Sequence, residues 1–367
     1  MTLLDTVRPS SRDGDVTVLV TGAGAVGASG IIKAIRRADA FDAHIVGVDT
    51  DPDAYGFTLV DTAETVPAAD TDAFVSDLLA VARREDADVI LPLNAAEVGP
   101  LSEAKPVFES EGIEVMALSP QALSVARDKG RLYDELVKQA HPVAPEFYRV
   151  STYDEFLDAV HALGYPNRRV CFKPPVSTDM RCFRVLDPDM DRFNALLNQK
   201  PNSTVTTLGD VLPVLQETVQ FPELVVMEFL PGEEYTVDAL VRDDETPILV
   251  SRSHNEACDD ASFVGTVEEN PELLQDTREL CSVFGLEYNV TFRFKYTAAG
   301  RPKLVDIHPR LSPSVTASVG AGANIPALSV QYAMGQELPE LDIEWGTHVT
   351  RDWQDVFYGP DKDPTTI

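Results

Sequence analysis

The chain has 367 residues, 44 % of them apolar and 25 % charged, which is enough for two or three globular units. No stretch approaches the ~18 uncharged apolar residues of a membrane helix, and no secretory signal is visible, so we expect neither membrane insertion nor secretion. Sixty acidic against thirty basic residues give a net charge of −30, which argues against nucleic-acid binding because phosphate contacts need a basic stripe.

The first part of the chain alternates strands with helices. We expect strands at 16–20, 44–49, 88–93 and 113–118, and helices at 31–38, 71–85 and 97–110. Such alternation is typical of a parallel sheet covered by helices on both faces. The sequence therefore predicts an α/β domain over residues 1–118.

The pattern changes after residue 118. We expect helices at 121–127, 131–139, 153–163 and 271–285, and strands in VCFKPP, MRCFRVL, LVVMEF, EYTVDALV, TPILVSR, NVTFRFKY and KLVDIHP. Successive strands joined by turns are typical of an antiparallel sheet. The second part therefore reads as an α+β region.

Charge and cysteine usage indicate the environment of the protein. Acidic residues are spread along the whole chain and lysine is scarce, a composition that resembles proteins of salt-accumulating organisms. We therefore expect a halophilic, archaeal source; an ordinary acidic cytosolic protein is the alternative. The four cysteines show no metal-binding spacing, so free thiols in a reducing cytoplasm are expected.

A glycine-rich turn follows the first expected strand. Gly22, Gly24 and Gly27 spell G-x-G-x-x-G, and Asp49 ends the second strand. This pattern is typical of dinucleotide binding, with the acid on a ribose, and alone it would predict an NAD-dependent oxidoreductase. The alternative is that the glycines only allow a tight turn and close helix packing. The second half of the chain favours that alternative.

Four segments of the second half resemble the ATP-grasp superfamily, most closely its carbamoyl-phosphate-synthase-like branch. They are ARDKGRLYDEL, VCFKPP, VVMEFLPGEEYTVD, and NVTFRF with LVDIHPRLSPS. The glycine-rich turn, GVDTDPDAYG and DVILPLNAAE resemble the N-terminal domain of that branch. The resemblance implies a Rossmann-like domain at 1–118, a small ATP-grasp subdomain at 119–190 and a C-terminal subdomain at 191–359, with Mg-ATP bound between the two subdomains.

The resemblance also implies which residues bind ATP. Lys129 and Lys173 would hold the phosphates, whose charge needs fixed cations. Lys173 is the stronger candidate, because an unpaired charge in an apolar strand is costly. The backbone of Glu228, Phe229 and Leu230 would run past the adenine, and Glu234 would accept from the ribose hydroxyls.

The last of the four segments would carry the metal and the phosphoryl-transfer chemistry. The family's metal-ligand positions correspond to Asp306, His308 and Thr291, which would hold Mg²⁺ or Mn²⁺. Oxygen ligands suit such hard cations, whereas imidazole favours softer metals, so His308 is an unusual ligand. Arg310 matches the family's arginine and, with Lys173, would be catalytic. Arg252 and Ser314 are candidate contacts for a substrate.

The implied activity is that of an ATP-dependent ligase, which joins a carboxylate to an amine or another nucleophile through an acyl phosphate. Its partners would be these small molecules, and a homodimer is possible in this family. The second hypothesis is a degenerate member that binds nucleotide without ligation. It rests on Thr291, on His308 and on the glycine-free loop PPVSTDMRCF, in which Asp179 adds repulsion of phosphate and Arg181 could replace some of the lost glycine amides.

Overall fold

The computed structural model describes residues 14–177, 182–198, 204–218, 221–242, 245–254, 264–351, 354–357 and 365–366. The chain forms two compact units. The first unit consists of Met1–Leu123, Tyr235–Phe292 and His308–Ile367, and the second of Ser124–Glu234 and Arg293–Ile307. Asp179 and Arg181 lie outside the described residues. The division of the chain at residues 118 and 190 stays a prediction.

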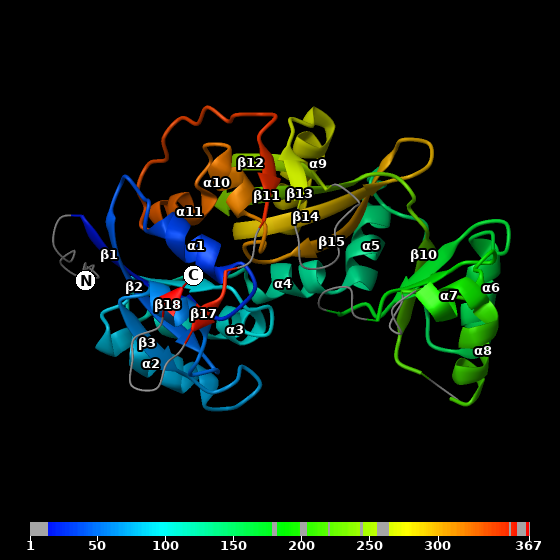
Figure 1. Ribbon diagram of the computed structural model, residues 1–367, viewed down its shortest axis with the longest axis horizontal. Coiled ribbons are helices and arrows are strands. Elements are labelled where there is room, and N and C mark those ends of the chain that lie inside the picture. The colour runs from blue at the N-terminus through cyan, green and yellow to red at the C-terminus, as the bar shows by residue number, and fades with distance from the viewer. Residues whose placement is uncertain are drawn as a thin grey trace, which may run out of the picture. The chain divides into compact units, whose positions relative to one another are not determined.

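A five-stranded sheet with parallel pairing forms the start of the first unit (Figure 1). Its order is β3-β2-β1-β4-β5, and Val18 lies opposite both Ile45 and Val89. The strands are β1 (Asp15–Thr21), β2 (Asp42–Asp49), β3 (Thr62–Thr65), β4 (Val89–Pro92) and β5 (Glu114–Val115). The helices between them are α1 (Ala28–Ile35), the 3₁₀ helix η1 (Tyr55–Leu59), α2 (Phe74–Arg84) and α3 (Val98–Glu109). This confirms the predicted α/β arrangement.

Alternation along β1 explains why both faces of this sheet are covered. Val18 and Val20 belong to one hydrophobic cluster, whereas Leu19 belongs to another with Phe74 and Phe108. Successive side chains of a strand point to opposite faces, so the two clusters lie on the two sides of the sheet.

A six-stranded sheet of order β15-β14-β11-β12-β13-β16 follows, and its strands β14 and β15 contribute residues to both units. The strands are β11 (Glu234–Arg242), β12 (Glu245–His254), β13 (Val264–Val267), β14 (Tyr288–Tyr296), β15 (Pro302–His308) and β16 (His348–Thr350). The helices are α9 (Pro271–Phe284), α10 (Thr316–Gly320) and α11 (Ile325–Ala333). A two-stranded sheet joins β17 (Val356–Phe357) to β18 (Thr365–Thr366).

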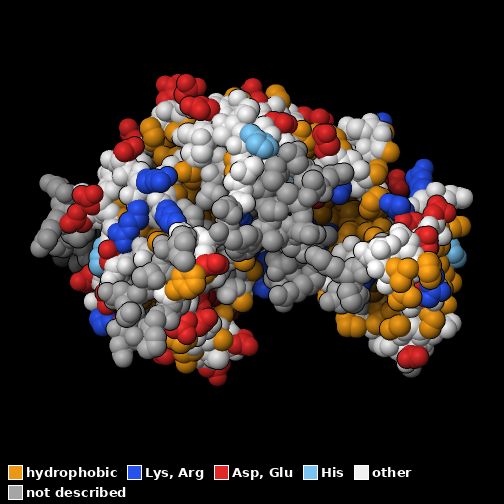
Figure 2. Space-filling model, viewed as in Figure 1, with side chains coloured by type: hydrophobic (Ala, Val, Ile, Leu, Met, Phe, Trp, Pro, Cys, Tyr) orange, Lys and Arg blue, Asp and Glu red, His pale blue; other side chains and the backbone are white. Residues whose placement is uncertain are grey.

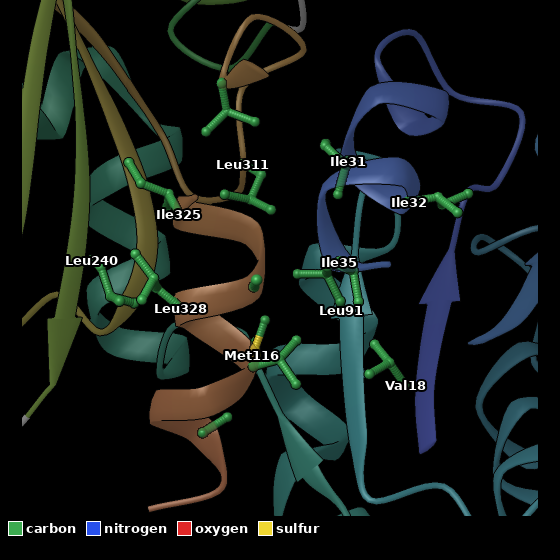
Figure 3. Packing of buried hydrophobic residues seen from close by; sticks show 14 of the residues in the cluster. Val18, Ile31, Ile32, Ile35, Leu91, Met116, Leu240, Leu311, Ile325 and Leu328 are labelled. Atoms are coloured by element: carbon green, nitrogen blue, oxygen red, sulfur yellow. The ribbon is translucent and has the colours of Figure 1, made fainter. Parts of the chain in front are cut away.

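One hydrophobic cluster joins the two sheets of the first unit. Figure 3 shows Ile31 and Ile35 of α1 on one side, with Leu311, Ile325 and Leu328 on the other. Each of these side chains is at most 6 % exposed, and full burial of such a side chain stabilises by about 1.5–3 kcal/mol. The N-terminal sheet and the later segments of this unit therefore share a single core.

The second unit contains a five-stranded sheet of order β6-β10-β7-β8-β9. Its strands are β6 (Phe147–Val150), β7 (Val170–Lys173), β8 (Arg184–Leu186), β9 (Val205–Thr206) and β10 (Leu224–Glu228). Its helices are α5 (Lys129–Lys138), α6 (Tyr153–Ala162), α7 (Arg192–Asn198) and α8 (Leu208–Gln216), while α4 (Pro120–Arg127) spans the unit boundary. Phe156 and Val160 of α6 pack against this sheet in a core with Val170 and Val226. None of the helices described is long and apolar enough to cross a membrane.

Candidate nucleotide site

Lys129 is the first residue of α5, where the local sequence fixes it. The side chain of Asp128 caps the helix by accepting from the backbone N–H of Arg131 at 3.0 Å. The Lys129 backbone N–H donates to Pro175 O at 2.9 Å, and its Nζ donates to Ser177 O at 3.2 Å. The residue is only 7 % exposed, and burial lowers the pKa of its ammonium group.

Lys173 is the last residue of β7 and is 4 % exposed. Its Nζ donates to Tyr133 Oη at 3.1 Å and to Val305 O at 3.0 Å. Burial lowers the pKa of Lys173 to about 7, and Lys129 lowers it further while Asp306 opposes the shift. The ammonium group is therefore held among neutral oxygens with little compensating negative charge.

Asp306 on β15 is the carboxylate that faces both lysines. It raises the pKa of Lys129 and of Lys173 against the larger effect of burial. Its Oδ2 accepts from Arg293 Nη2 at 3.0 Å. The structure thus brings together three residues that the sequence singled out, and all three belong to the second unit. We call Lys129, Tyr133, Lys173, Arg293 and Asp306 the lysine–aspartate cluster.

The charges of this cluster do not balance. Two lysines and one arginine face Asp306, and Glu234 adds a carboxylate at 3.8 Å from Arg293 Nε and 4.0 Å from Lys295 Nζ. Buried cations without matching carboxylates favour the binding of an anion, which restores their charged form. A polyanion such as a phosphate chain would supply the negative charge that this cluster lacks.

The predicted adenine-binding segment also lies in the second unit. Glu228 ends β10, where its backbone N–H donates to Glu146 O and its Oε1 accepts from the Glu146 N–H, both at 3.0 Å. Phe229 lies under the Arg169 guanidinium at 5.7 Å, and Leu230 is 5 % exposed. Gly232 follows at a close approach: an added Cβ would lie 2.8 Å from Tyr296 O, so no side chain fits.

Arg252 and Ser314 lie in a second buried group, which belongs to the first unit. Arg252 is fully buried and forms an ion pair through Nη1 with Asp238. Its Nη2 donates to Ser314 Oγ at 2.9 Å and to Ser312 Oγ at 3.3 Å. We call Arg252, Asp238 and the hydroxyl groups around them the Arg252–Asp238 cluster. Here the charge of the arginine is matched by a carboxylate inside the protein.

Thr291 belongs to the Arg252–Asp238 cluster, because its hydroxyl donates to Asp238 Oδ1 at 3.0 Å. Arg310 Nη1 donates to Leu311 O at 3.0 Å, and His308 is half-buried at the end of β15. Asp306 belongs to the second unit, whereas Thr291 and His308 belong to the first. Among the described residues, no three His, Cys, Asp or Glu side chains form a group that could hold a metal ion.

The glycine-rich turn has a packing explanation. The N–H of Gly24 donates to Asp49 Oδ2 at 2.7 Å, so the candidate ribose ligand already binds the turn itself. Gly27 has a φ of +87°, and an added Cβ would lie 2.6 Å from Pro313 Cα. Glycine is needed here for a left-handed conformation and for close contact with the segment before α10.

Sequence reasoning missed Tyr133, Arg293 and Asp238 of these two clusters, and also a separate buried acid, Glu97. Asp238 carries the same signal as Lys173, a single charge within an apolar strand. Tyr133 lies one helical turn after Lys129, a spacing that places both on one face of α5. Glu97 is 4 % exposed and accepts from Thr21 Oγ1 at 2.5 Å, and burial raises its pKa to about 7.

Two family descriptions match the chain. Residues 18–116 match "PylC-like, N-terminal domain", and residues 220–352 match "ATP-grasp in the biosynthetic pathway with Ter operon". The chain has an ATP-grasp fold, and residues 220–352 match an ATP-grasp family. The two matched ranges contain the glycine-rich turn, Glu228, Asp306 and Arg310.

A curated relative shares part of the sequence of the ATP-grasp protein. It is the formate-dependent phosphoribosylglycinamide formyltransferase of Parasynechococcus marenigrum (strain WH8102), 30 % identical over 175 residues. The match covers 47 % of this chain and 41 % of that relative, so the chain spans about two fifths of the relative's length.

Solved structures share the fold of the ATP-grasp protein. An ADP complex of N5-carboxyaminoimidazole ribonucleotide synthetase has a TM-score of 0.66 at 14 % identity, and the match covers 92 % of this chain and 81 % of that one. The biotin carboxylase domain dimer of Hydrogenobacter thermophilus 2-oxoglutarate carboxylase, with MgADP and bicarbonate, also has a TM-score of 0.66 at 14 % identity. There the match covers 90 % of this chain and 73 % of that one.

Proposed function

We propose that this protein is an ATP-dependent ligase that joins a carboxylate to an amine or another nucleophile through an acyl phosphate. The observation that carries the proposal is the meeting of Lys129, Lys173 and Asp306 in one buried cluster with excess positive charge. The names of the relatives agree with it, because they describe a formate-dependent formyltransferase and a synthetase of a carboxyamino compound.

In this proposal Lys129 and Lys173 hold the phosphate chain of ATP. The negative charge of the phosphates replaces the solvation that burial removes, so both ammonium groups are protonated when nucleotide is bound. The backbone of Glu228, Phe229 and Leu230 pairs with the base, and Glu234 accepts from the ribose. Two of the relatives were solved with ADP, which supports a nucleotide site in this fold.

Asp306 is the residue that fits a Mg²⁺ ion, with Mn²⁺ as an alternative. Mg²⁺ is commonly held by one or two carboxylates together with substrate phosphates, and Asp306 supplies such a carboxylate beside the lysines. The ion would neutralise charge on the transferred phosphoryl group. Thr291 is less suited to this role, because its hydroxyl already donates to Asp238. His308 remains a candidate only for a softer metal.

The chemical step would then proceed by charge neutralisation and positioning. An oxygen of the substrate carboxylate forms a bond to the γ-phosphorus, and ADP leaves. The nucleophile forms a bond to the carboxyl carbon, loses a proton, and phosphate leaves. Lys173 and Arg310 would stabilise the transferred group. A substrate carboxylate could contact Arg252 and Ser314 only by replacing Asp238 as the partner of Arg252.

A degenerate protein that binds nucleotide without ligation is the second candidate. It is favoured by the hydroxyl of Thr291, which the Arg252–Asp238 cluster already uses. Calorimetric titration with Mg-ATP, followed by ADP release with carboxylates and amines offered singly and in pairs, separates the two. ADP release that requires both co-substrates supports the ligase; tight binding without release supports the degenerate protein.

Lys173→Met and Lys138→Met form a matched pair for these measurements, because Lys138 is exposed on the same unit. We expect loss of nucleotide binding only for Lys173→Met. Binding of NAD with no binding of ATP would contradict both candidates and support an oxidoreductase.

We further propose that the protein is halophilic and cytoplasmic, and that it belongs to the carbamoyl-phosphate-synthase-like branch. We also propose that it forms a homodimer. The net charge of −30 supports the halophilic origin, and the free thiols of Cys171, Cys182 and Cys281 suit a reducing compartment. Sedimentation at low and high KCl tests the dimer and the salt requirement together.

A further inference from the structure

A cavity of about 580 Å³ lies beside α1 in the first unit. Its walls come from α1, from η1, from the start of α10 and from four later residues, Arg351, Gln354, Asp355 and Val356. Cavities of about 300–1,000 Å³ are the usual size for small-molecule sites. No lining residue of the cavity belongs to the lysine–aspartate cluster, whose residues are part of the other unit.

The walls of this cavity are largely apolar. Val26, Tyr55, Leu59, Pro313 and Val356 line it. The Tyr55 hydroxyl donates to Ala25 O, so its polar group is already used within the protein. Such walls suit the apolar body of a ligand better than a hydrated ion.

Two cations also line the cavity. Lys33 of α1 is exposed, and Arg351 is half-buried after β16. Arg351 Nη2 donates to Pro313 O at 2.5 Å, and burial lowers the pKa of its guanidinium, as does the positive charge of Arg252. Within the described part of the chain, neither cation forms an ion pair with a carboxylate, and Asp355 is the one acid among the lining residues.

A neighbouring cation of this region does have a carboxylate partner. Acidic residues outnumber basic residues by two to one, and Arg36, close to Lys33, is paired with Asp61 at 2.8 Å. Figure 2 shows Lys and Arg side chains gathered over α1. A partly buried guanidinium without a carboxylate partner is stabilised when an anion binds beside it.

We propose that this cavity binds a small organic anion, with a carboxylate or phosphate group held by Lys33 and Arg351 and an apolar body against Val26 and Leu59. Both the size and the apolar walls exclude a bare inorganic ion as the best ligand. The proposal does not depend on the proposed ligase activity, because none of its residues takes part in the lysine–aspartate cluster.

Calorimetric titration with four probes tests the proposal on the full chain in about 1 M KCl, where charges beyond about 3 Å are screened. The probes are 2-naphthoate, 2-naphthyl phosphate, the uncharged 2-naphthalenemethanol and inorganic phosphate. We expect one of the two naphthyl anions to bind at a single site, at least tenfold more tightly than the uncharged probe and than inorganic phosphate. The tighter of the two identifies the anionic group.

Variants then locate the bound probe. Lys33→Gln and Arg351→Gln should each weaken binding about tenfold, as expected for loss of one charged hydrogen bond. Arg37→Gln, which removes an exposed cation just after the same helix, should leave binding unchanged. Lys33→Gln is the decisive variant, because Arg351 also holds Pro313 whereas Lys33 is exposed.

A Ser29→Phe variant fills the cavity from α1 without removing either cation. It should abolish binding of the naphthyl anion. The proposal is overturned if neither naphthyl anion binds, if inorganic phosphate binds as tightly as they do, or if Lys33→Gln and Arg37→Gln have equal affinities. A naphthyl anion that binds instead at the exposed apolar residues of α7 would keep its affinity in Ser29→Phe and lose it in Phe193→Ser.

Discussion

The lysine–aspartate cluster and the Arg252–Asp238 cluster both bury cations in apolar surroundings, but they differ in how far other groups compensate the positive charge. Arg252 is fully buried, and one carboxylate and two serine hydroxyls accept from it. Lys173 is almost as deeply buried, yet among the described residues its ammonium group donates to a phenol and a backbone carbonyl and to no carboxylate. Burial accordingly lowers the pKa of Lys173 to about 7.

The difference separates a structural charge from a functional one. A buried ion pair with satisfied hydrogen bonds stabilises one arrangement of the chain, and removing either partner is costly. A buried cation with too little negative charge around it lowers the free energy of unfolding, and an anion that binds beside it raises that free energy again. The sequence analysis predicted that Lys173 and Arg252 both contact a ligand. Only the structure shows that Arg252 already has a carboxylate partner within the protein.

The largest expected effect follows from breaking the matched pair. Asp238→Asn leaves the guanidinium of Arg252 buried without its counter-charge, which should lower the free energy of unfolding by about 3–5 kcal/mol. Urea denaturation measures this change. Glu111→Gln is the control, because Arg83 and Glu111 form a pair at 2.6 Å on the surface, with side chains 52 % and 32 % exposed.

We expect the control to change stability by less than about 1 kcal/mol. A double variant, Arg252→Gln with Asp238→Asn, should recover much of the loss because no charge remains buried. An Asp238→Asn protein as stable as the wild type would show that the Arg252–Asp238 cluster is not held together by charge.

The next effect concerns the unmatched cluster. Lys173→Met should weaken Mg-ATP binding by about 10–100-fold, the usual cost of losing one hydrogen bond between charged groups. It should not weaken the fold. Below pH 7 the wild-type lysine is protonated in both folded and unfolded states, so folding buries a charge that methionine does not carry.

The stability advantage of Lys173→Met should therefore be greatest below pH 7 and shrink as the pH rises towards 10.5, where the lysine is neutral in both states. Urea denaturation across this range checks the sign. Lys138→Met should change neither nucleotide affinity nor the pH profile. Loss of stability in Lys173→Met at low pH would mean that its hydrogen bonds outweigh its burial cost.

The sequence predicted the main elements because their patterns are strong and local. The expected strand at 44–49 is β2 (Asp42–Asp49), and the expected helix at 271–285 is α9 (Pro271–Phe284). The N-terminal cap of α9 can be recognised in the sequence, because Asn270 directly precedes Pro271. The short strand β3 (Thr62–Thr65) was missed, because an edge strand without a continuous apolar run gives little signal.

The candidate site could be predicted only in part. Lys173 was found as a charge in an apolar strand, where burial makes a charge costly, and Asp306 was found by the resemblance to the ATP-grasp superfamily. Tyr133, the partner of Lys173, lies 40 residues away in the sequence. Arg293, the partner of Asp306, lies on the neighbouring strand β14, and the expected hairpin did not indicate that these two side chains meet. The compensation of Arg252 by Asp238 joins two neighbouring strands, and the expected hairpin did not indicate which side chains share a face.

Glu97 extends the comparison to an unmatched acid. Burial raises its pKa to about 7 from 4.5, so between these values the folded protein holds a proton that the unfolded chain has lost. The free energy of unfolding should therefore fall as the pH rises from about 4.5 to 7. Glu97→Gln stays uncharged and should be more stable than the wild type by about 2–3 kcal/mol near pH 8, with little difference near pH 4.

Urea denaturation at several pH values measures the Glu97 effect. Glu103→Gln, on the exposed face of α3, should follow the wild-type profile. Parallel profiles for Glu97→Gln and the wild type would show that Glu97 is ionised in the folded protein throughout, so that a buried acid, unlike a buried lysine, is compensated here.

The smallest effect tests how completely Arg252 is satisfied. Ser314→Ala removes an acceptor at 2.9 Å from Arg252 Nη2, while Ser312 Oγ remains at 3.3 Å. We expect a loss of about 1 kcal/mol in the free energy of unfolding, with Mg-ATP affinity unchanged. Ser76→Ala, which removes an exposed hydroxyl of α2, should cost less than about 0.5 kcal/mol. If Ser314→Ala matches this control in stability but impairs ligation, then Arg252 is satisfied without Ser314, and Ser314 contributes to the reaction rather than to the fold.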